Sequence, residues 1–485
     1  MEYLNLTLLD LHKALVAGEV KPEDLFKSAI ALAKANDCNA FEYITGKEGF
    51  EALKELNKKD KSNIMWGIPF VIKDNFSTKD ILTTASSNIL NGYKPVFSSE
   101  VYNRLIQAGG IPVGKTTLDE LGMGGLGKTG HKGPTFNPYD KEHKHIIGGS
   151  SCGSAAAIAS GIVPLAIGSD TGDSVRKPAS HGGLVGFKPT WGRISRYGLF
   201  PFATSLDHVA YFTRSVEDCA GVLEILSGRD EKDLTSSEKP VGKYLANING
   251  NVKGLKVAII DEIFNSVSDK NVKDLFLKAV SSLEQQGAVI NHVSMDSKLL
   301  RAVLPTYFII SSAEATSNYA CLDGIKYGPR YEGKNYEEVM IKARTNGFSE
   351  AIRRRFIIGS FSLLKENQQD TFLKAQRCRR LIVNAVNDIL KDNDVIFLPA
   401  APNTAPLFDS NVDRLTDEHL IIDNYLAIGN FAGLPSLTLP IGFIDSMPFG
   451  ANITGRAFDE QTVLNCSLAV ENKTGLKNIF AKGNR

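Results

Sequence analysis

Two short turns rich in glycine and serine lie between residues 148 and 174. The first, GGSSCGS (148–154), leads into the small residues of Ala155–Ser160, which are typical of a closely packed helix. The second, Ser169–Ser174, follows the apolar run Val163–Ile167, which is typical of a strand. Such turns let main-chain amides approach a ligand closely, although they are also common as purely structural turns. Turns on either side of one helix–strand unit could place two serines together in space.

A lysine far upstream could act as a base for these serines. Lys73 directly follows the apolar run Ile68–Ile72, and a lysine at the end of a buried strand is unusual because an ammonium group is costly to bury. Burial lowers the pKa of a lysine and favours the neutral amine, which accepts protons. His181 is the first histidine that follows the two turns. The pattern therefore indicates a serine nucleophile, a serine relay and a lysine base.

These residues resemble the motifs of the amidase signature family. That family has a GGSS(G)GS turn, then DTGGSIR, then GLKPT, with a lysine far upstream beside KD(N). The matching segments here are GGSSCGS (148–154), DTGDSVR (170–176), GFKPT (186–190) and IKDN (72–75). The resemblance covers nearly the whole chain. Strings such as AEATSNYACLDGIKYG, FAGLPSLTLPIG and GRAFDE resemble one branch of the family, the glutaminase (A) subunits of tRNA-dependent amidotransferases.

The resemblance implies a catalytic triad and an oxyanion hole. Ser174 matches the nucleophile, Lys73 matches the base, and Ser150 matches the serine, held in a cis peptide, that bridges them. The interval of 174 − 150 = 24 residues between the serines agrees with the family pattern. Ser151 would be a supporting hydrogen-bonding group. The main-chain amides that would face the developing oxyanion belong to Thr171, Gly172, Asp173 and Ser174.

The resemblance also implies a binding site for glutamine. Arg354, in the string Arg353–Arg355, is expected to face the α-carboxylate, with Arg355 as the alternative. A guanidinium group pairs well with a carboxylate, although a solvated basic helix face is the competing interpretation of any one of these arginines. Asp423 matches an aspartate that faces the amine, and Tyr307 matches a tyrosine near the pocket.

The resemblance implies a glutaminase that supplies ammonia for converting Glu-tRNA(Gln) to Gln-tRNA(Gln), with Asp-tRNA(Asn) left open as a substrate of the complex. The expected partners are a B subunit, which would bind misacylated tRNA and use ATP and Mg²⁺, and a small C subunit. No cofactor and no metal are expected in this chain. The alternatives are a stand-alone amidase for another small amide and a catalytically impaired scaffold subunit.

The sequence departs from the family pattern at three places. Asp173 replaces the second glycine of DTGGS. A carboxylate ~4 Å from a developing oxyanion would oppose it by about 4 kcal/mol at an effective dielectric near 20, unless it points away or Arg176 or Lys177 neutralises it. Cys152 replaces a glycine of GGSSGGS, and the stretch GGLGKTGHKG (124–133) differs from the polar string expected near the amide pocket.

Two other segments match the sequence patterns of known motifs. Gly109–Thr116 matches the phosphate-binding pattern GxxxxGK[ST], but a helical stretch precedes it and IPV inside it is strand-like, so Lys115 is more simply a lysine at a strand end. Gly149–Gly153 matches the nucleophile elbow of α/β-hydrolases, which would make Ser151 the nucleophile. That mechanism needs a late histidine, and His419 is the available one. Replacing His419 would inactivate an α/β-hydrolase and leave a Ser-Ser-Lys amidase active.

The composition excludes several classes of protein. With 55 basic and 54 acidic residues the net charge is +1, so the whole chain has no general attraction to nucleic acid or membranes. The six cysteines are far apart and predict reduced thiols. The one close pair of histidines, His143 and His145, lies in the charged string KEHKH and is expected to be solvated. No signal-like segment or apolar run of ~20 residues is present, which predicts a soluble, cytoplasmic protein.

The elements that would position these residues indicate an α/β fold. Apolar runs alternate with helical stretches, which predicts a large, mixed and mostly parallel sheet covered by helices on both faces. Late strands are expected at 395–400 and 434–442, and a long surface connection at 228–253. Residues 1–485 are expected to form a single amidase domain, in which 1–60 form an N-terminal helical layer.

Overall fold

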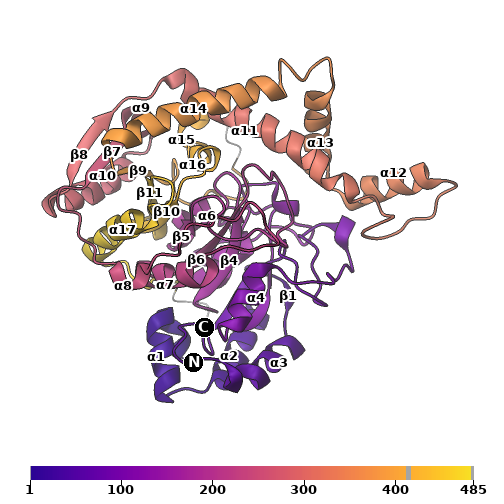
Figure 1. The fold of residues 1–485 in the computed structure, drawn as a ribbon, viewed down its shortest axis with the longest axis horizontal. Coiled ribbons are helices and arrows are strands. Elements are labelled where there is room, and N and C mark those ends of the chain that lie inside the picture. The colour runs from indigo at the N-terminus through magenta and orange to yellow at the C-terminus, as the bar shows by residue number, and fades with distance from the viewer. Residues whose placement is uncertain (1, 411–416, 482–485) are drawn as a thin grey trace.

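The computed structural model describes residues 2–410 and 417–481, and these contain eleven strands in one mixed sheet (Figure 1). Across the sheet the order is β1-β3-β2-β4-β6-β5-β10-β11-β9-β7-β8. The strands are β1 (Phe41–Ile44), β2 (Pro69–Lys73), β3 (Ile111–Thr116), β4 (Leu165–Asp170), β5 (Val185–Lys188), β6 (His208–Thr213), β7 (Lys256–Ile260), β8 (Val289–Val293), β9 (Val395–Pro399), β10 (Ser436–Ile444) and β11 (Met447–Gly455).

Helices surround the sheet. Every residue of β2, β3, β4, β5, β6 and β9 is buried, so both faces of the sheet are covered there. The α-helices are α1 (Leu8–Ala17), α2 (Pro22–Ala35), α3 (Lys47–Glu55), α4 (Glu100–Gln107), α5 (Cys152–Ala159), α6 (Arg176–Gly182), α7 (Val216–Leu226), α8 (Tyr244–Asn247), α9 (Asp261–Asn265), α10 (Lys270–Gln285), α11 (Ser297–Asn318), α12 (Tyr336–Gly347), α13 (Glu350–Leu363), α14 (Phe372–Asp392), α15 (Asp417–Ile422), α16 (Ala427–Phe431) and α17 (Glu460–Thr474). In Figure 1, α12 and α13 extend away from the body of the molecule.

The strand directions divide the sheet into groups. β2, β3 and β4 are parallel to one another, and so are β7, β8 and β9. The pairs from β4 through β6, β5, β10 and β11 to β9 are antiparallel, as is the outer pair of β1 with β3. The predicted mixed α/β fold is confirmed. Of the ten strand pairs in the described residues, four are parallel, and all four lie in these two groups. The active-site candidates of β2 and β4 lie in the first group.

The first 60 residues form helices around one edge of the sheet. Thr7 caps α1, because its hydroxyl accepts a hydrogen bond from the amide of Asp10 (3.2 Å). Gly18 ends α1 with a φ of 75°, and Pro22 begins α2. These residue types are typical of helix boundaries. The layer also contains β1, which pairs with β3 and so belongs to the sheet.

The late strands predicted from the sequence are present as β9 and β10. The predicted surface connection, 228–253, has little regular structure, but it includes the short helix α8, whose Tyr244 is buried. Among the described helices, none has both the length and the apolar character needed to cross a membrane.

Candidate active site

Lys73 lies at the end of β2 and is completely buried. Its Nζ donates a hydrogen bond to Ser150 Oγ (2.8 Å) and another to Ser169 Oγ (2.9 Å). Asn75 Nδ2 donates to the same hydroxyl of Ser169 (3.0 Å). Sequence reasoning missed Ser169 and Asn75. A signal existed, because Ser169 lies near the end of β4, and β4 is a parallel neighbour of β2, so the two strands end at the same edge of the sheet.

The environment of Lys73 favours the neutral amine. Burial lowers its pKa to about 8, although the carboxylates of Asp119, Asp170 and Asp207 oppose this shift. Roughly a tenth of the molecules would then carry the neutral amine at pH 7. An amine in this state can accept a proton from the hydroxyl of Ser150, which is already in hydrogen-bond contact with it.

Ser174 lies in the turn between β4 and α6, and this turn is tied directly to the turn that carries Ser150. The amide of Ser151 donates to the carbonyl of Ser174 (3.1 Å), and Ser151 Oγ donates to the carbonyl of Ser169 (3.1 Å). The peptide bond before Ser150 is cis. Gly168 permits this approach, since a Cβ there would lie 2.9 Å from Ser151 Oγ. The two serine turns expected from the sequence therefore pack against each other.

A buried ion pair holds the turn of residues 171–174. Arg176 Nη2 lies 2.9 Å from Asp170 Oδ1, and both side chains are fully buried. The same guanidinium donates to the carbonyl of Gly172 (2.7 Å) and, through Nη1, to the carbonyl of Leu426 (2.8 Å). Burial alone would raise the pKa of Asp170, but Arg176 beside it holds that pKa well below its usual range. Arg176 therefore has a structural role in this turn.

Asp173 is paired with a lysine. Lys177 Nζ lies 2.7 Å from Asp173 Oδ2 and 3.0 Å from Asp423 Oδ1. Burial lowers the pKa of Lys177, but the two carboxylates outweigh it and raise the pKa above the ordinary value. Of the two cations considered for neutralising Asp173, Lys177 makes the ion pair. The carboxylate therefore does not act on the turn as an isolated negative charge.

Asp119 holds the glycine-rich loop of residues 124–129 against the serines. Its carboxylate accepts hydrogen bonds from the amides of Gly127, Lys128 and Thr129 (2.9, 2.9 and 3.1 Å), and its own amide donates to the carbonyl of Ser150 (3.2 Å). Asp119 was not among the residues predicted from the sequence. Its role depends on contacts that only the folded chain brings together.

A cavity of about 580 Å³ opens beside the turn of residues 171–174. Its lining includes Asp173, Lys177, Tyr307, Arg355 and Asp423, which come from four separate parts of the chain. Ser174 is 3% exposed and lies next to Asp173 in the chain, but it is not part of the lining. The predicted residues Tyr307 and Asp423 are thus at the cavity, and the ring of Tyr307 packs against Gly172, where a Cβ would lie 3.0 Å from it.

The position of Arg354 does not fit the substrate-binding role expected of it. Its side chain is 72% exposed and forms an ion pair with Glu350, one turn earlier on α13. Arg355, the alternative, lines the cavity and lies over the ring of Phe308, 4.3 Å from the centroid. Consecutive helix residues point about 100° apart, so only one of the two can face the cavity. We therefore take Arg355 as the candidate for an anionic group of the substrate.

His181 lies in the wall of the cavity and is almost completely buried. Burial lowers its pKa to about 4, so the imidazole is neutral near pH 7. The late histidine needed for an α/β-hydrolase, His419, has a side chain outside the described residues. Ser151 does not follow a strand, since the chain before Gly149 has no strand after β3. The strand–turn–helix context of a nucleophile elbow is absent from this described segment.

The formal phosphate-binding motif forms part of the sheet. Residues 111–116 of the motif are β3, which follows α4. Lys115 is buried, with Nζ 3.0 Å from Asp74 Oδ1 and 2.9 Å from the carbonyl of Phe76. A phosphate loop needs a free lysine at a turn that leads into a helix. Lys115 is a structural residue at the end of a strand.

Comparison with known proteins identifies the family of the chain. A family described as Amidase matches residues 25–464. The A subunit of the glutamyl-tRNA(Gln) amidotransferase of Pediococcus pentosaceus is 39% identical over 98% of both chains, and that of Streptococcus sanguinis is 40% identical over 98% of this chain and 97% of the relative. The crystal structure of the corresponding Thermotoga maritima protein superposes with a TM-score of 0.80 at 34% identity, covering 99% of this chain and 98% of the other. The chain belongs to the amidase signature family and is an enzyme of the amidase and amidotransferase class.

Proposed function

We propose that this chain is the glutaminase subunit of a tRNA-dependent amidotransferase, acting in the cytoplasm. It would hydrolyse the side-chain amide of glutamine and supply ammonia for converting Glu-tRNA(Gln) to Gln-tRNA(Gln). The observation that carries this proposal is the contact between fully buried Lys73 and Ser150 Oγ at 2.8 Å. Relatives of nearly equal length, which are named glutamyl-tRNA(Gln) amidotransferase subunits, support the choice of substrate.

The chemistry would run through three side chains. The neutral amine of Lys73 takes the proton of Ser150, and Ser150 takes the proton of Ser174. Ser174 Oγ attacks the amide carbon, and main-chain amides from Thr171 to Ser174 stabilise the oxyanion. The proton returns to the leaving nitrogen, ammonia departs, and water then hydrolyses the glutamyl ester of Ser174.

Within this proposal the second half-reaction belongs to partners. A B subunit would bind the misacylated tRNA and use ATP with Mg²⁺ to activate its glutamyl group, and a small C subunit would complete the complex. The net charge of +1 supports tRNA binding mainly by the partner. No cofactor is assigned to this chain.

The test measures ammonia release from glutamine by the chain with its partner subunits. We expect Ser174→Ala to reduce the rate by at least about 10⁴-fold, since loss of a nucleophile removes nearly all covalent catalysis. Arg354→Ala serves as a control from the exposed face of α13 and should keep full activity. If Ser174→Ala stays active, the nucleophile is assigned wrongly, and Ser151→Ala becomes the next variant to measure.

One observation favours a second candidate, a stand-alone amidase for another small amide. The carboxylate of Asp423, which would bind the amino group of glutamine, is already paired with Lys177 at 3.0 Å. A substrate without an ammonium group would leave this pair undisturbed. Comparing glutamine with 4-carbamoylbutanoate, which lacks the amino group, separates the two candidates. Faster hydrolysis of 4-carbamoylbutanoate without partner subunits would favour the stand-alone enzyme.

A further inference from the structure

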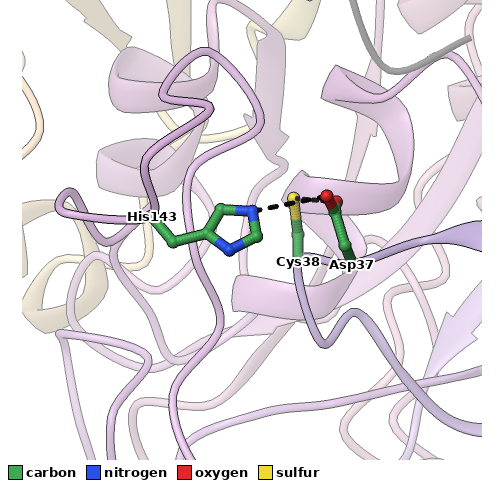
Figure 2. A group of neighbouring side chains, drawn as sticks. All are labelled: Asp37, Cys38 and His143. Atoms are coloured by element: carbon green, nitrogen blue, oxygen red, sulfur yellow. Dashed lines mark hydrogen bonds and ion pairs between the residues drawn. The ribbon is translucent and has the colours of Figure 1, made fainter.

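A second group of reactive side chains lies where the segment between α2 and β1 meets the loop before Ser150 (Figure 2). Asp37, Cys38 and His143 each present one donor atom, and the three atoms lie within 4.8 Å of one another. His143 Nε2 is 3.6 Å from Asp37 Oδ2, and Cys38 Sγ is 3.5 Å from Asp37 Oδ1. Sulfur, imidazole nitrogen and carboxylate oxygen are the donors that zinc binds in proteins.

Two donor separations lie near those of a tetrahedral zinc site, and each involves a different oxygen of Asp37. Bonds of about 2.0 Å to nitrogen and oxygen and about 2.3 Å to sulfur place the donors roughly 3.3–3.5 Å apart. The carboxylate of Asp37 is 3.6 Å from His143 Nε2 through Oδ2 and 3.5 Å from Cys38 Sγ through Oδ1. The three donor atoms lie within 4.8 Å of one another, so a rotation of the Asp37 carboxylate could bring one oxygen toward an ion shared with Cys38 and His143.

Contacts that involve no metal hold both sides of the group in place. The ring of His143 stacks on Phe136, with 5.1 Å between centroids and 11° between planes. The amide of Phe136 donates to the carbonyl of Cys38 (3.1 Å). Asn39, next to Cys38, donates through Nδ2 to the carbonyl of Pro134 (3.0 Å). Ligands that are already ordered lose little entropy when the ion binds.

Exposure and charge also suit a cation. The thiol of Cys38 is buried, whereas Asp37 is exposed and His143 is partly exposed, so the group borders solvent on the side of Asp37. A thiolate and a carboxylate together supply two negative charges, which balance a divalent ion. Such a pattern could not be read from the sequence, because Cys38 and His143 are 143 − 38 = 105 positions apart.

We propose that Asp37, Cys38 and His143 bind one zinc-type divalent cation, with water as the fourth ligand. The site clamps the N-terminal helical layer to the loop that leads to Ser150. On binding, the S–H bond of Cys38 breaks and a sulfur–metal bond forms, while the proton passes to solvent. This site is independent of the amide chemistry and does not require the proposed function to hold.

The experiment titrates the chelator-treated, full-length chain with Co²⁺ as a spectroscopic probe and then displaces it with Zn²⁺. We expect a saturable thiolate-to-cobalt charge-transfer band at one equivalent, which one equivalent of Zn²⁺ removes. Because loss of even an outer hydrogen-bond partner weakens metal sites about 10–100-fold, His143→Gln and Asp37→Asn should each weaken binding by at least about 10-fold. Cys38→Ser should abolish the band.

Cys38 is buried, so Cys38→Ser could lose the band by destabilising the chain. Further variants separate this effect from the loss of a metal ligand. Asp37→Asn changes an exposed side chain and should leave the fold intact. His292→Gln, on distant β8, and Cys378→Ser, on α14, should keep the band unchanged. A wild-type chain with no saturable band overturns the proposal, and so does a band that titrates with wild-type affinity in both His143→Gln and Asp37→Asn.

Discussion

At the scale of single residues, the buried amine of Lys73 should be required for activity but should lower the stability of the folded chain at neutral pH. Burial lowers its pKa from 10.5 to about 8, so the unfolded chain binds more protons between these pH values and stability rises with pH across them. Below pH 8 the buried cation costs about 3 kcal/mol. We expect Lys73→Met to be inactive, yet more stable than wild type at pH 7 by about 1–3 kcal/mol. The gain should disappear near pH 11, and denaturant unfolding at both pH values measures it.

The same amine should determine the pH dependence of the reaction. Because only neutral Lys73 accepts a proton, kcat/KM should rise about tenfold per pH unit up to pH 8 and then level off, in line with its pKa of about 8. Stopped assays of ammonia release from pH 6 to 9.5 give the profile. A flat profile from pH 6 to 8 would exclude Lys73 as the base. The exposed-site variant Arg354→Ala should reproduce the wild-type curve.

Asp173 and Lys177 should behave as a coupled pair. Lys177→Met leaves the Asp173 carboxylate unpaired beside the proposed oxyanion hole, so we expect kcat to fall about 10- to 100-fold, which corresponds to about 1–3 kcal/mol. Adding Asp173→Gly to that variant removes the stray charge and should recover most of the loss. The four kcat values of the cycle measure the coupling directly. Independent, additive effects would show that Lys177 does not act by neutralising Asp173.

At the scale of elements, one carboxylate holds the loop of residues 124–129 beside Ser150. Asp119→Asn removes the charge that accepts three amide hydrogen bonds, each between 2.9 and 3.1 Å. We expect a loss of about 2 kcal/mol of stability and faster hydrogen exchange at the amides of Gly127 and Thr129. Asp80→Asn, at an exposed position, is the matched control. Unchanged exchange at these amides would show that the loop is held by other contacts.

The sequence predicted strands that form a clear apolar run. It did not predict residues whose roles depend on contacts with distant segments of the chain. Strands flanked by helices, such as β2, β4 and β9, were predicted from apolar runs. β6 and β11 were missed, although β10, which is also antiparallel, was predicted. In β11 the apolar pattern is interrupted by Pro448, Gly450 and Asn452. Among the residues of the candidate site, Lys73 and Ser150 were predicted because they belong to sequence motifs. Ser169 and Asp119 were not predicted, because their contacts join segments that are distant in the sequence.

At the scale of the whole molecule, the balanced charge predicts that the isolated chain binds tRNA weakly. With a net charge of +1, the isolated chain should bind tRNA no more tightly than a Kd of about 10⁻⁴ M at physiological salt. Under the proposed function the B subunit binds the tRNA, and the complex with partner subunits should then bind much more tightly. Filter binding of labelled tRNA at two salt concentrations measures both. Tight, salt-sensitive binding by the isolated chain would assign tRNA recognition to this chain instead.

Arg176 donates hydrogen bonds to the carbonyl of Leu426 and to Oδ1 of Asn430, residues that are synthesised much later than Arg176 itself. The ribosome makes the turn that carries Ser174 about 250 residues before the segment that buries its arginine, since 426 − 176 = 250. At about 5–20 residues per second, this interval lasts roughly 10–50 s. During that time the nascent chain contains the turn of residues 171–174 but not the segment that hydrogen-bonds Arg176, so these contacts form only when synthesis is nearly complete.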